Sequence, residues 1–364
     1  MTCLEEASYV SMQHKVSIAV GKWELSNWLS YEIDGNILVA ADAFSMTVGS
    51  PTPENFSTIL EGDRCQIFVD GHSQMKGVID DVGLRYNKTE SAMTIRGRSL
   101  AAYLVDCSAP TTGYDEISLL DLATNVCSTW NIPVRAHPDA KQAIAAAEAE
   151  EFGTLPRTQP EPGETCWDFL NRYAKNQGLM MWMSIDGALV ISKPNYSQAP
   201  TFSLHHHLTA PRNLKNNILR GDVIRGMADR YSHITVKAQR QAEDEISGEE
   251  AAGIEYTATD DELVDRGISR PLILTDYEIT NIAQARRRAE HEVALRRAKG
   301  TRIQYKVPWH GTGQAVYGYD MTVDLDDELS GLNGTYYILG RKLRGNKYEG
   351  TSTSITLCER GALA

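Results

Sequence analysis

Apolar residues recur at every second position through much of the first hundred residues, with polar residues between them. Four short runs show the pattern, and they contain Val16, Ile18 and Val20; Phe44, Met46 and Val48; Cys65, Ile67 and Val69; and Val82, Leu84 and Tyr86. Because strand side chains alternate between the two faces of a sheet, this period predicts half-buried β-strands. Asp34-Gly35 and Asp70-Gly71 are typical of hairpin turns. Residues 1–98 are therefore predicted to be mostly β, as an antiparallel barrel or sandwich.

In the middle of the chain, the spacing of apolar residues changes to the period of an α-helix. Residues 118–130 place apolar side chains on one stripe behind a capping serine. A second helix is predicted over residues 165–178, and a hairpin with Asp186-Gly187 at its turn follows. Residues 109–195 are thus predicted to form a compact α+β module.

Strand periods return after Pro211 and are interrupted by one long helix, predicted over residues 280–299. Two stretches carry weaker patterns. The Ala- and Glu-rich residues 143–151 fit either a short helix or a loop, and the acidic residues 243–250 are predicted to be a mobile loop. Strands are expected from Ile303 to the end of the chain.

Length and composition indicate a protein of several folded domains. At 364 residues, 42% of them hydrophobic, the chain can fill about two to four domains. No run of about 18 apolar residues and no N-terminal signal pattern occur, so we expect cytoplasmic synthesis without membrane insertion. The six scattered cysteines are expected to be free and mostly buried thiols. The net charge of −12 argues against a general nucleic-acid binder, which needs Lys and Arg to neutralise phosphates.

Candidate catalytic and cofactor motifs are incomplete. His291-Glu292 begins like a zinc-protease helix, but Leu295 stands where the second histidine is needed. The acidic residues 324–328 lack the glycine and the final glutamate of a calcium loop, and are expected to form a solvated turn. The Gly311–Gly313 segment lacks a phosphate-binding context and is expected to be a flexible loop. We therefore predict no catalytic residue, no cofactor and no metal site.

The run His205-His206-His207 is the strongest metal-like signal in the chain. Three adjacent side chains cannot all point at one ion, and no Cys, Asp or Glu lies at ligand spacing nearby in the sequence. The interpretation favoured here is a loop or strand end that leads to Pro211. A ring of histidines within a symmetric oligomer is a further alternative.

One helix concentrates basic residues in this acidic chain. The predicted helix over residues 280–299 carries Arg286, Arg287, Arg288, Arg296, Arg297 and Lys299. Bidentate arginines suit carboxylates on a neighbouring subunit, so a partner interface is the favoured interpretation. DNA binding and a plain solvated face remain open as alternatives.

Several motifs occur in an order that resembles a known family. The segment Gly97–Ala109 joins a strand to a helix, as in the baseplate hub proteins of contractile-tailed, Mu-like phages and their late-control relatives. The resemblance continues through motifs at Gly62-Asp63, Gly163-Glu164, Arg270-Pro271, the Arg286–Lys299 helix and Tyr337-Ile338-Leu339. Each motif is weak alone, but together they cover most of the chain in matching order.

This resemblance implies a structural protein, not an enzyme. In that family three copies form a ring, and two related β domains per chain match the hexameric tail tube on one side and the trimeric central spike on the other. The implied location is the baseplate of a virion tail, after synthesis in the host cytoplasm, with DNA only as passing cargo. Trp23, Trp28, Trp182 and Trp309 are candidate anchors of the trimer interface.

The implied fold is α+β and mostly β, with two antiparallel, barrel-like tube domains and an α+β module. The first β domain is expected to combine residues 1–108 with about 200–235. Residues 109–195 form the module, and residues 236–364 form the second β domain, which carries the 280–299 helix.

Two alternatives to the phage hub remain. The same fold forms the hub part of type VI secretion spikes, but such proteins usually continue into a β-helical needle, and no needle-like repeats precede Ala364. A separate spike protein is therefore expected. The other alternative is a tail-tip cell-wall hydrolase, which requires a carboxylate pair or a zinc triad.

Overall fold

The computed structural model describes residues 14–138, 141, 158–209, 216–238, 253–276, 278–279, 281–312 and 314–363. Cys3, the 143–151 tract, the acidic 243–250 stretch, Thr280 and Gly313 lie outside these ranges, so the predictions for them stay predictions. The five described cysteines are free thiols, and all but Cys107 are buried, as predicted.

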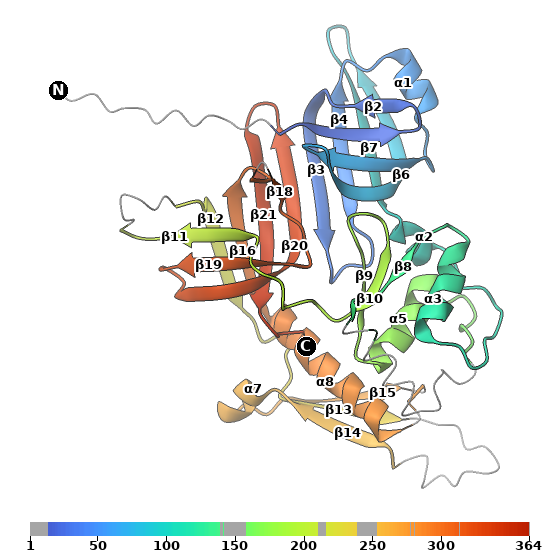
Figure 1. Ribbon diagram of the computed structural model, residues 1–364, viewed down its shortest axis with the longest axis vertical. Coiled ribbons are helices and arrows are strands. Elements are labelled where there is room, and N and C mark those ends of the chain that lie inside the picture. The colour runs from blue at the N-terminus through green and yellow to red at the C-terminus, as the bar shows by residue number, and fades with distance from the viewer. Residues whose placement is uncertain are drawn as a thin grey trace.

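The N-terminal part is a set of antiparallel strands (Figure 1), whose buried apolar residues belong to one core cluster. Its elements are β1 (Val16–Val20), β2 (Trp23–Leu25), β3 (Trp28–Asn36), β4 (Ala43–Gly49), α1 (Pro53–Thr58), β5 (Arg64–Val69), β6 (His72–Tyr86) and β7 (Ser91–Ser99). Ile18, Met46 and Ile67, from three of the four predicted runs, are 0% exposed. The fourth run differs, because Tyr86 lies where β6 turns into β7 and is 77% exposed.

The predicted α+β module follows, with its own core. Its elements are α2 (Ala101–Asp106), α3 (Leu119–Ser128), β8 (Val134–Arg135), α5 (Cys166–Asn176), β9 (Met180–Met183) and β10 (Leu189–Ser192). Ser118 caps α3 and Thr165 caps α5, each hydroxyl accepting a backbone N–H at 3.1 Å. Strands β9 and β10 form the predicted hairpin. These local predictions are confirmed.

The C-terminal part adds a second set of strands to the same sheet. The strands that join it are β11 (Phe202–His206), β12 (Arg220–Arg225), β16 (Thr301–Pro308), β19 (Met321–Asp327), β20 (Leu332–Asn346) and β21 (Gly350–Glu359). Strands β17 (Gly311–Thr312) and β18 (Ala315–Val316) form a separate two-stranded sheet. The long β20 pairs with β19 and β21, and its second half pairs with β3 from Gly340 to Asn346. One hydrogen-bonded path therefore runs from β12 through β20 and β3 to β2, with the red and blue strands side by side in Figure 1.

A smaller sheet lies beneath a long helix. It contains β13 (His233–Ala238), β14 (Glu255–Thr259) and β15 (Pro271–Asp276), with helix α7 (Asp261–Asp265) between β14 and β15 and α8 (Ile282–Gly300) packed against β13 and β14. Asn281 caps α8, so the predicted 280–299 helix is confirmed within two residues. Ile282, in the first turn of this helix, is 54% exposed.

The mostly β, multidomain fold is confirmed, but residues 200–235 pair differently from the expectation. They do not join the N-terminal strands: β11 pairs with β19, β12 pairs with β16, and β13 enters the small sheet. The cause is packing, because Phe202 and Leu204 share a core with C-terminal side chains such as Leu325. The remaining domain boundaries stay predictions.

Gly35, predicted in a hairpin turn, and Gly97, expected at a strand-to-helix junction, both lie inside strands. Gly35 sits within β3, and a Cβ there would lie 2.5 Å from a ring carbon of Tyr319. Gly97 sits within β7, where a Cβ would lie 2.2 Å from the carbonyl oxygen of Val78. Close approach, not turning, requires glycine at both positions. The Asp70-Gly71 turn is confirmed, with φ of 50° and 80° between β5 and β6.

Candidate assembly surfaces

The predicted arginine surface lies on α8, which packs against the small sheet on one side and contacts α5 of the module. Arg288 and Arg296 flank Glu292 one turn away on either side, with N–O distances of 2.5 and 3.0 Å. The Glu292 side chain is 9% exposed. Burial alone raises its pKa, but the two guanidinium groups reverse this and lower the pKa to about 2. This inner part of the cluster is a structural ion-pair ladder.

The outer part of the cluster faces solvent. Arg286 is 62% exposed and pairs with Glu290 at 2.8 Å, and Arg297 is 45% exposed and lies 3.8 Å from Glu262. Arg287 is partly buried, and Lys299 is exposed. Exposed pairs of this kind contribute about 0 to 1 kcal/mol each, so Arg286 and Arg297 are free to exchange partners. A partner interface at these arginines stays a prediction.

A buried polar network joins the three parts of the chain. The Tyr319 hydroxyl lies 2.7 Å from Asp42 Oδ2 and 2.7 Å from the carbonyl oxygen of Met183. Arg341, 2% exposed, donates to the carbonyl oxygens of Ile33 at 3.3 Å and Gln74 at 3.0 Å. Burial raises the pKa of Asp42 to about 6, although hydrogen bonds from Tyr319 and Asn36 act against it. The network has the features of a rigid junction.

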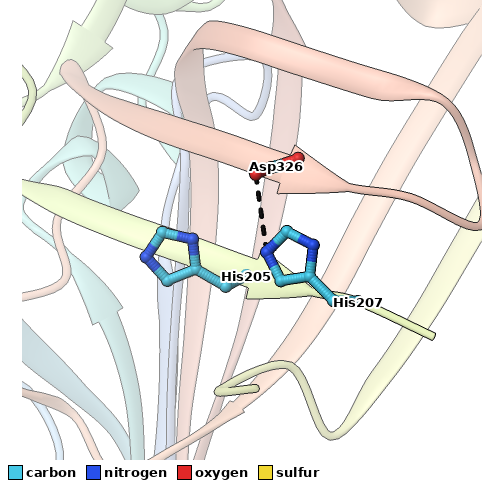
Figure 2. A group of neighbouring side chains, drawn as sticks. All are labelled: His205, His207 and Asp326. Carbon is cyan, nitrogen blue, oxygen red and sulfur yellow. Dashed lines mark ion pairs between the residues drawn. The ribbon is translucent and has the colours of Figure 1, made fainter. Parts of the chain in front are cut away.

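The histidine run lies along β11 and its end. Successive side chains alternate, so His206 faces Asp327, with Nδ1 2.9 Å from Oδ1. His205 and His207 point to the other face beside Asp326 of β19 (Figure 2). The strand-end interpretation is confirmed. Sequence spacing missed Asp326, which only the pairing of β11 with β19 brings to the histidines.

The incomplete catalytic and cofactor motifs of the sequence lie in regular helices and strands of the fold. His291 is buried on α8, where burial lowers its pKa to about 4. The acidic residues expected in a solvated turn instead belong largely to strand β19, where Asp324 accepts from Thr335 and Asp327 from Tyr305. Gly311, expected in a flexible loop, pairs through β17 with β18.

The candidate tryptophan anchors have different environments. Trp182 is 1% exposed within a core and cannot contact a partner, which corrects that prediction. Trp23 and Trp28 are partly buried, with their indole N–H groups donating to Thr58 and Val16. Trp309 is also partly buried, so these three stay candidates.

None of the described helices is both long and apolar enough to cross a bilayer.

Two families match the first half of the chain. Residues 15–99 match the family described as Mu phage baseplate assembly protein GpP-like, N-terminal. Residues 101–193 match the second domain of the family described as baseplate hub protein gp44-like. The border between the two matches coincides with the passage from β7 to α2.

Known proteins are similar over nearly the whole chain. The baseplate hub protein gp44 of Escherichia phage Mu is 24% identical over 358 residues, which cover 96% of this chain and 89% of that protein. A tail protein from Neisseria meningitidis MC58 is 27% identical, with a TM-score of 0.79 and coverage of 96% and 98%. The 43 kDa tail protein of prophage MuSo2 from Shewanella oneidensis shares the fold at 22% identity, with a TM-score of 0.77 and coverage of 96% and 100%.

A more distant fold match comes from secretion systems. The E. coli c3393 protein, described as a component of the type VI secretion system, is 9% identical, with a TM-score of 0.54 over 94% of this chain and 76% of that one. At that identity the likeness concerns the fold alone.

Proposed function

The chain belongs to the baseplate hub proteins of Mu-like phages, and from that premise we propose that three copies form a ring between the tail tube and the central spike. The observation that carries this proposal is the match to the Mu hub over 96% of the chain. Its finer parts, namely the trimer, the two partners and the passage of DNA, each rest on further arguments.

The ring is supported by the free edges of the long sheet. Among the described strands, β12 ends the hydrogen-bonded path on one side and β2 ends it on the other. Unpaired backbone groups at such edges favour pairing with another chain. A head-to-tail contact between unlike edges, repeated three times, closes into a ring. Leu219 and Ile224, 60% and 48% exposed at β12, supply apolar area for that contact.

The two-sided role is supported by the architecture. Each chain contributes two sets of strands, which three copies would arrange as six around an axis, so one face suits a hexameric tube. The other face would carry a trimeric spike. The solvent-exposed Arg286 and Arg297 are the residues proposed to meet carboxylates of such a partner.

Passage of DNA is supported by charge. Three copies of a chain with a net charge of −12 give a strongly acidic ring. Phosphate contacts with basic side chains would retain DNA, whereas an acidic channel lets it slide. A protein with this role belongs in the baseplate of a virion tail.

Light scattering behind a sizing column, over a range of concentrations, tests the ring. We expect three times the chain mass of 40.3 kDa. If the protein is a monomer alone, addition of the candidate spike should produce the trimer. A monomer under both conditions would overturn the ring.

The hydrolase alternative is tested separately. We propose that the chain has no enzymatic role, and zymography on peptidoglycan should give no clear band. A band that persists in highly purified protein would contradict the structural role. Because the fold is shared with a component of the type VI secretion system, that system is a second candidate assembly for this chain. The identity of the spike protein that co-purifies with the chain would distinguish a phage tail from a type VI system.

A further inference from the structure

Strands β11 and β19 place three metal-binding side chains on one face of the sheet. The two strands are parallel, with His205 opposite Asp326 and His206 opposite Asp327. Because paired residues of neighbouring strands point to the same face, His205, His207 and Asp326 gather on one side. His206 and Asp327 point to the other side. His205 and His207 therefore lie on the same face of the sheet as Asp326, whereas His206 lies on the opposite face with Asp327.

The geometry of the first group fits a coordination site. One ligand atom from each residue lies within 4.8 Å of the other two, and His207 Nε2 lies 3.4 Å from Asp326 Oδ2 (Figure 2). Two ligands of a tetrahedral zinc ion, each about 2.0 to 2.1 Å from the metal, lie about 3.3 Å apart. The two imidazole rings are nearly parallel, at 17°, with centroids 6.3 Å apart.

Two ring nitrogens of this group have unmet hydrogen-bonding capacity. His205 Nδ1 and His207 Nε2 are both buried and make no hydrogen bond within the described residues, although His207 Nε2 lies 3.4 Å from Asp326 Oδ2. A buried polar atom without a hydrogen bond costs about 1 to 3 kcal/mol, so His205 Nδ1 in particular indicates a missing ligand. Figure 2 shows a nitrogen of each ring turned toward the space beside Asp326.

Neighbouring amides hold the three residues in place. Asn217 Oδ1 accepts from the His205 backbone N–H at 2.7 Å, and Asn216 Oδ1 accepts from that of His207 at 2.9 Å. Asn333 Nδ2 donates to Asp326 Oδ1 at 3.1 Å, which leaves Oδ2 for the site. The amide of Asn333 orients a ligand side chain, which raises the affinity of a metal site, whereas Asn216 and Asn217 fix the backbone of the two histidines.

We propose that His205, His207 and Asp326 bind one divalent transition-metal ion per chain, of the Zn²⁺ class. Two imidazoles and one carboxylate suit such ions, whereas Ca²⁺ and Mg²⁺ require a shell of oxygen atoms. A fourth position stays open for water. The ion fastens β11, which pairs only with β19 among the described strands, to a strand about 120 residues later in the chain. Its role is structural, since it stabilises the folded state that binds it.

Zinc titration of tag-free, chelator-treated full-length protein tests the site. We expect one Zn²⁺ per chain by isothermal titration calorimetry, a raised melting temperature, and intense visible absorption with Co²⁺ in its place. His207→Ala should weaken Zn²⁺ binding by at least about tenfold and abolish the cobalt spectrum. His206→Ala is the matched control, because it removes a neighbouring imidazole from the opposite face and should leave Zn²⁺ binding unchanged.

Asp326→Asn provides a second test if His207→Ala does not fold, because the amide keeps the shape of the carboxylate. It too should weaken Zn²⁺ binding and remove the cobalt spectrum. Absence of Zn²⁺ binding at millimolar concentration would overturn the proposal and leave only a His207–Asp326 ion pair. Unchanged binding in Asp326→Asn, or one ion per three chains, would also overturn it.

Discussion

At the scale of single residues, the hydroxyl of Tyr319 faces more acceptors than it can serve. Its one proton lies between Asp42 Oδ2 and the Met183 carbonyl oxygen. The hydrogen bond that Tyr319 donates to Asp42 favours the charged carboxylate, but burial is the larger effect and favours the neutral form of Asp42.

Replacing Asp42 with Asn should remove one pH-dependent contribution to stability. The pKa of Asp42 is about 6 in the folded protein against an ordinary 3.8, so the folded state binds its proton more tightly. This contribution to the free energy of unfolding is complete below about pH 4 and is lost as the pH rises through 6. The advantage of Asp42→Asn over wild type should therefore grow, by about 2 to 3 kcal/mol, between pH 4 and 7.

Urea unfolding at a series of pH values measures this difference. The exposed carboxylate variant Glu61→Gln serves as control for the loss of one negative charge. A constant difference between Asp42→Asn and wild type across this range would contradict the assignment of the proton to Asp42.

Residues whose partners are close in sequence could be predicted, and those with distant partners could not. Ser118 and Thr165 cap their helices through groups three positions away, which the sequence displays. Asp42 meets Tyr319 across 277 positions, and His207 meets Asp326 across strands. Only the strand order brings these pairs together, so no local pattern reveals them.

At the scale of elements, helix α8 combines two kinds of arginine that look alike in sequence. Arg288 and Arg296 neutralise the buried Glu292, whereas Arg286 and Arg297 sit on its exposed side. The sequence predicted the helix and its charge because both follow from local spacing. It could not separate the two kinds of arginine, because the burial of Glu292 depends on the tertiary packing of α8, which contacts the small sheet and α5.

Alanine substitutions should separate the two kinds of arginine. Arg288→Ala leaves Glu292 buried with one counter-ion fewer and should lower the free energy of unfolding by about 2 to 4 kcal/mol. Arg286→Ala, the matched control on the same helix, should change it by less than about 0.5 kcal/mol. Chemical unfolding followed by circular dichroism measures both. Equal effects would contradict this division of the cluster.

At the scale of the whole molecule, β20 connects parts that the sequence separates. The sequence predicted many strands and the α+β module, since alternation and capping are local. It placed residues 200–235 with the N-terminal strands, although their partners are β16 and β19. Alternation shows that a strand has a buried face, but it does not show which strand lies beside it. For the same reason, the pairing of β20 with β3 could not be predicted from the sequence.

The pairing of β20 with β3 leads us to expect that the two sets of strands unfold together. Leu343 lies on β20, is 0% exposed, and belongs to the core of the N-terminal strands, opposite Ile33 of β3. Leu343→Ala should cost about 2 to 5 kcal/mol through the cavity it leaves. Because one sheet carries both sets of strands, hydrogen exchange should accelerate in β4 and β7 as well as in β16 and β21.

Leu122→Ala is the matched control, since Leu122 is also 0% exposed but belongs to the core of the module. Its faster exchange should stay within α3, α5 and β9. If Leu343→Ala accelerated exchange only in β16 and β21, the two sets of strands would unfold independently. A hub built of two strand sets on one sheet should instead resist load as a unit, because a force on either set reaches the other through the backbone hydrogen bonds between β3 and β20.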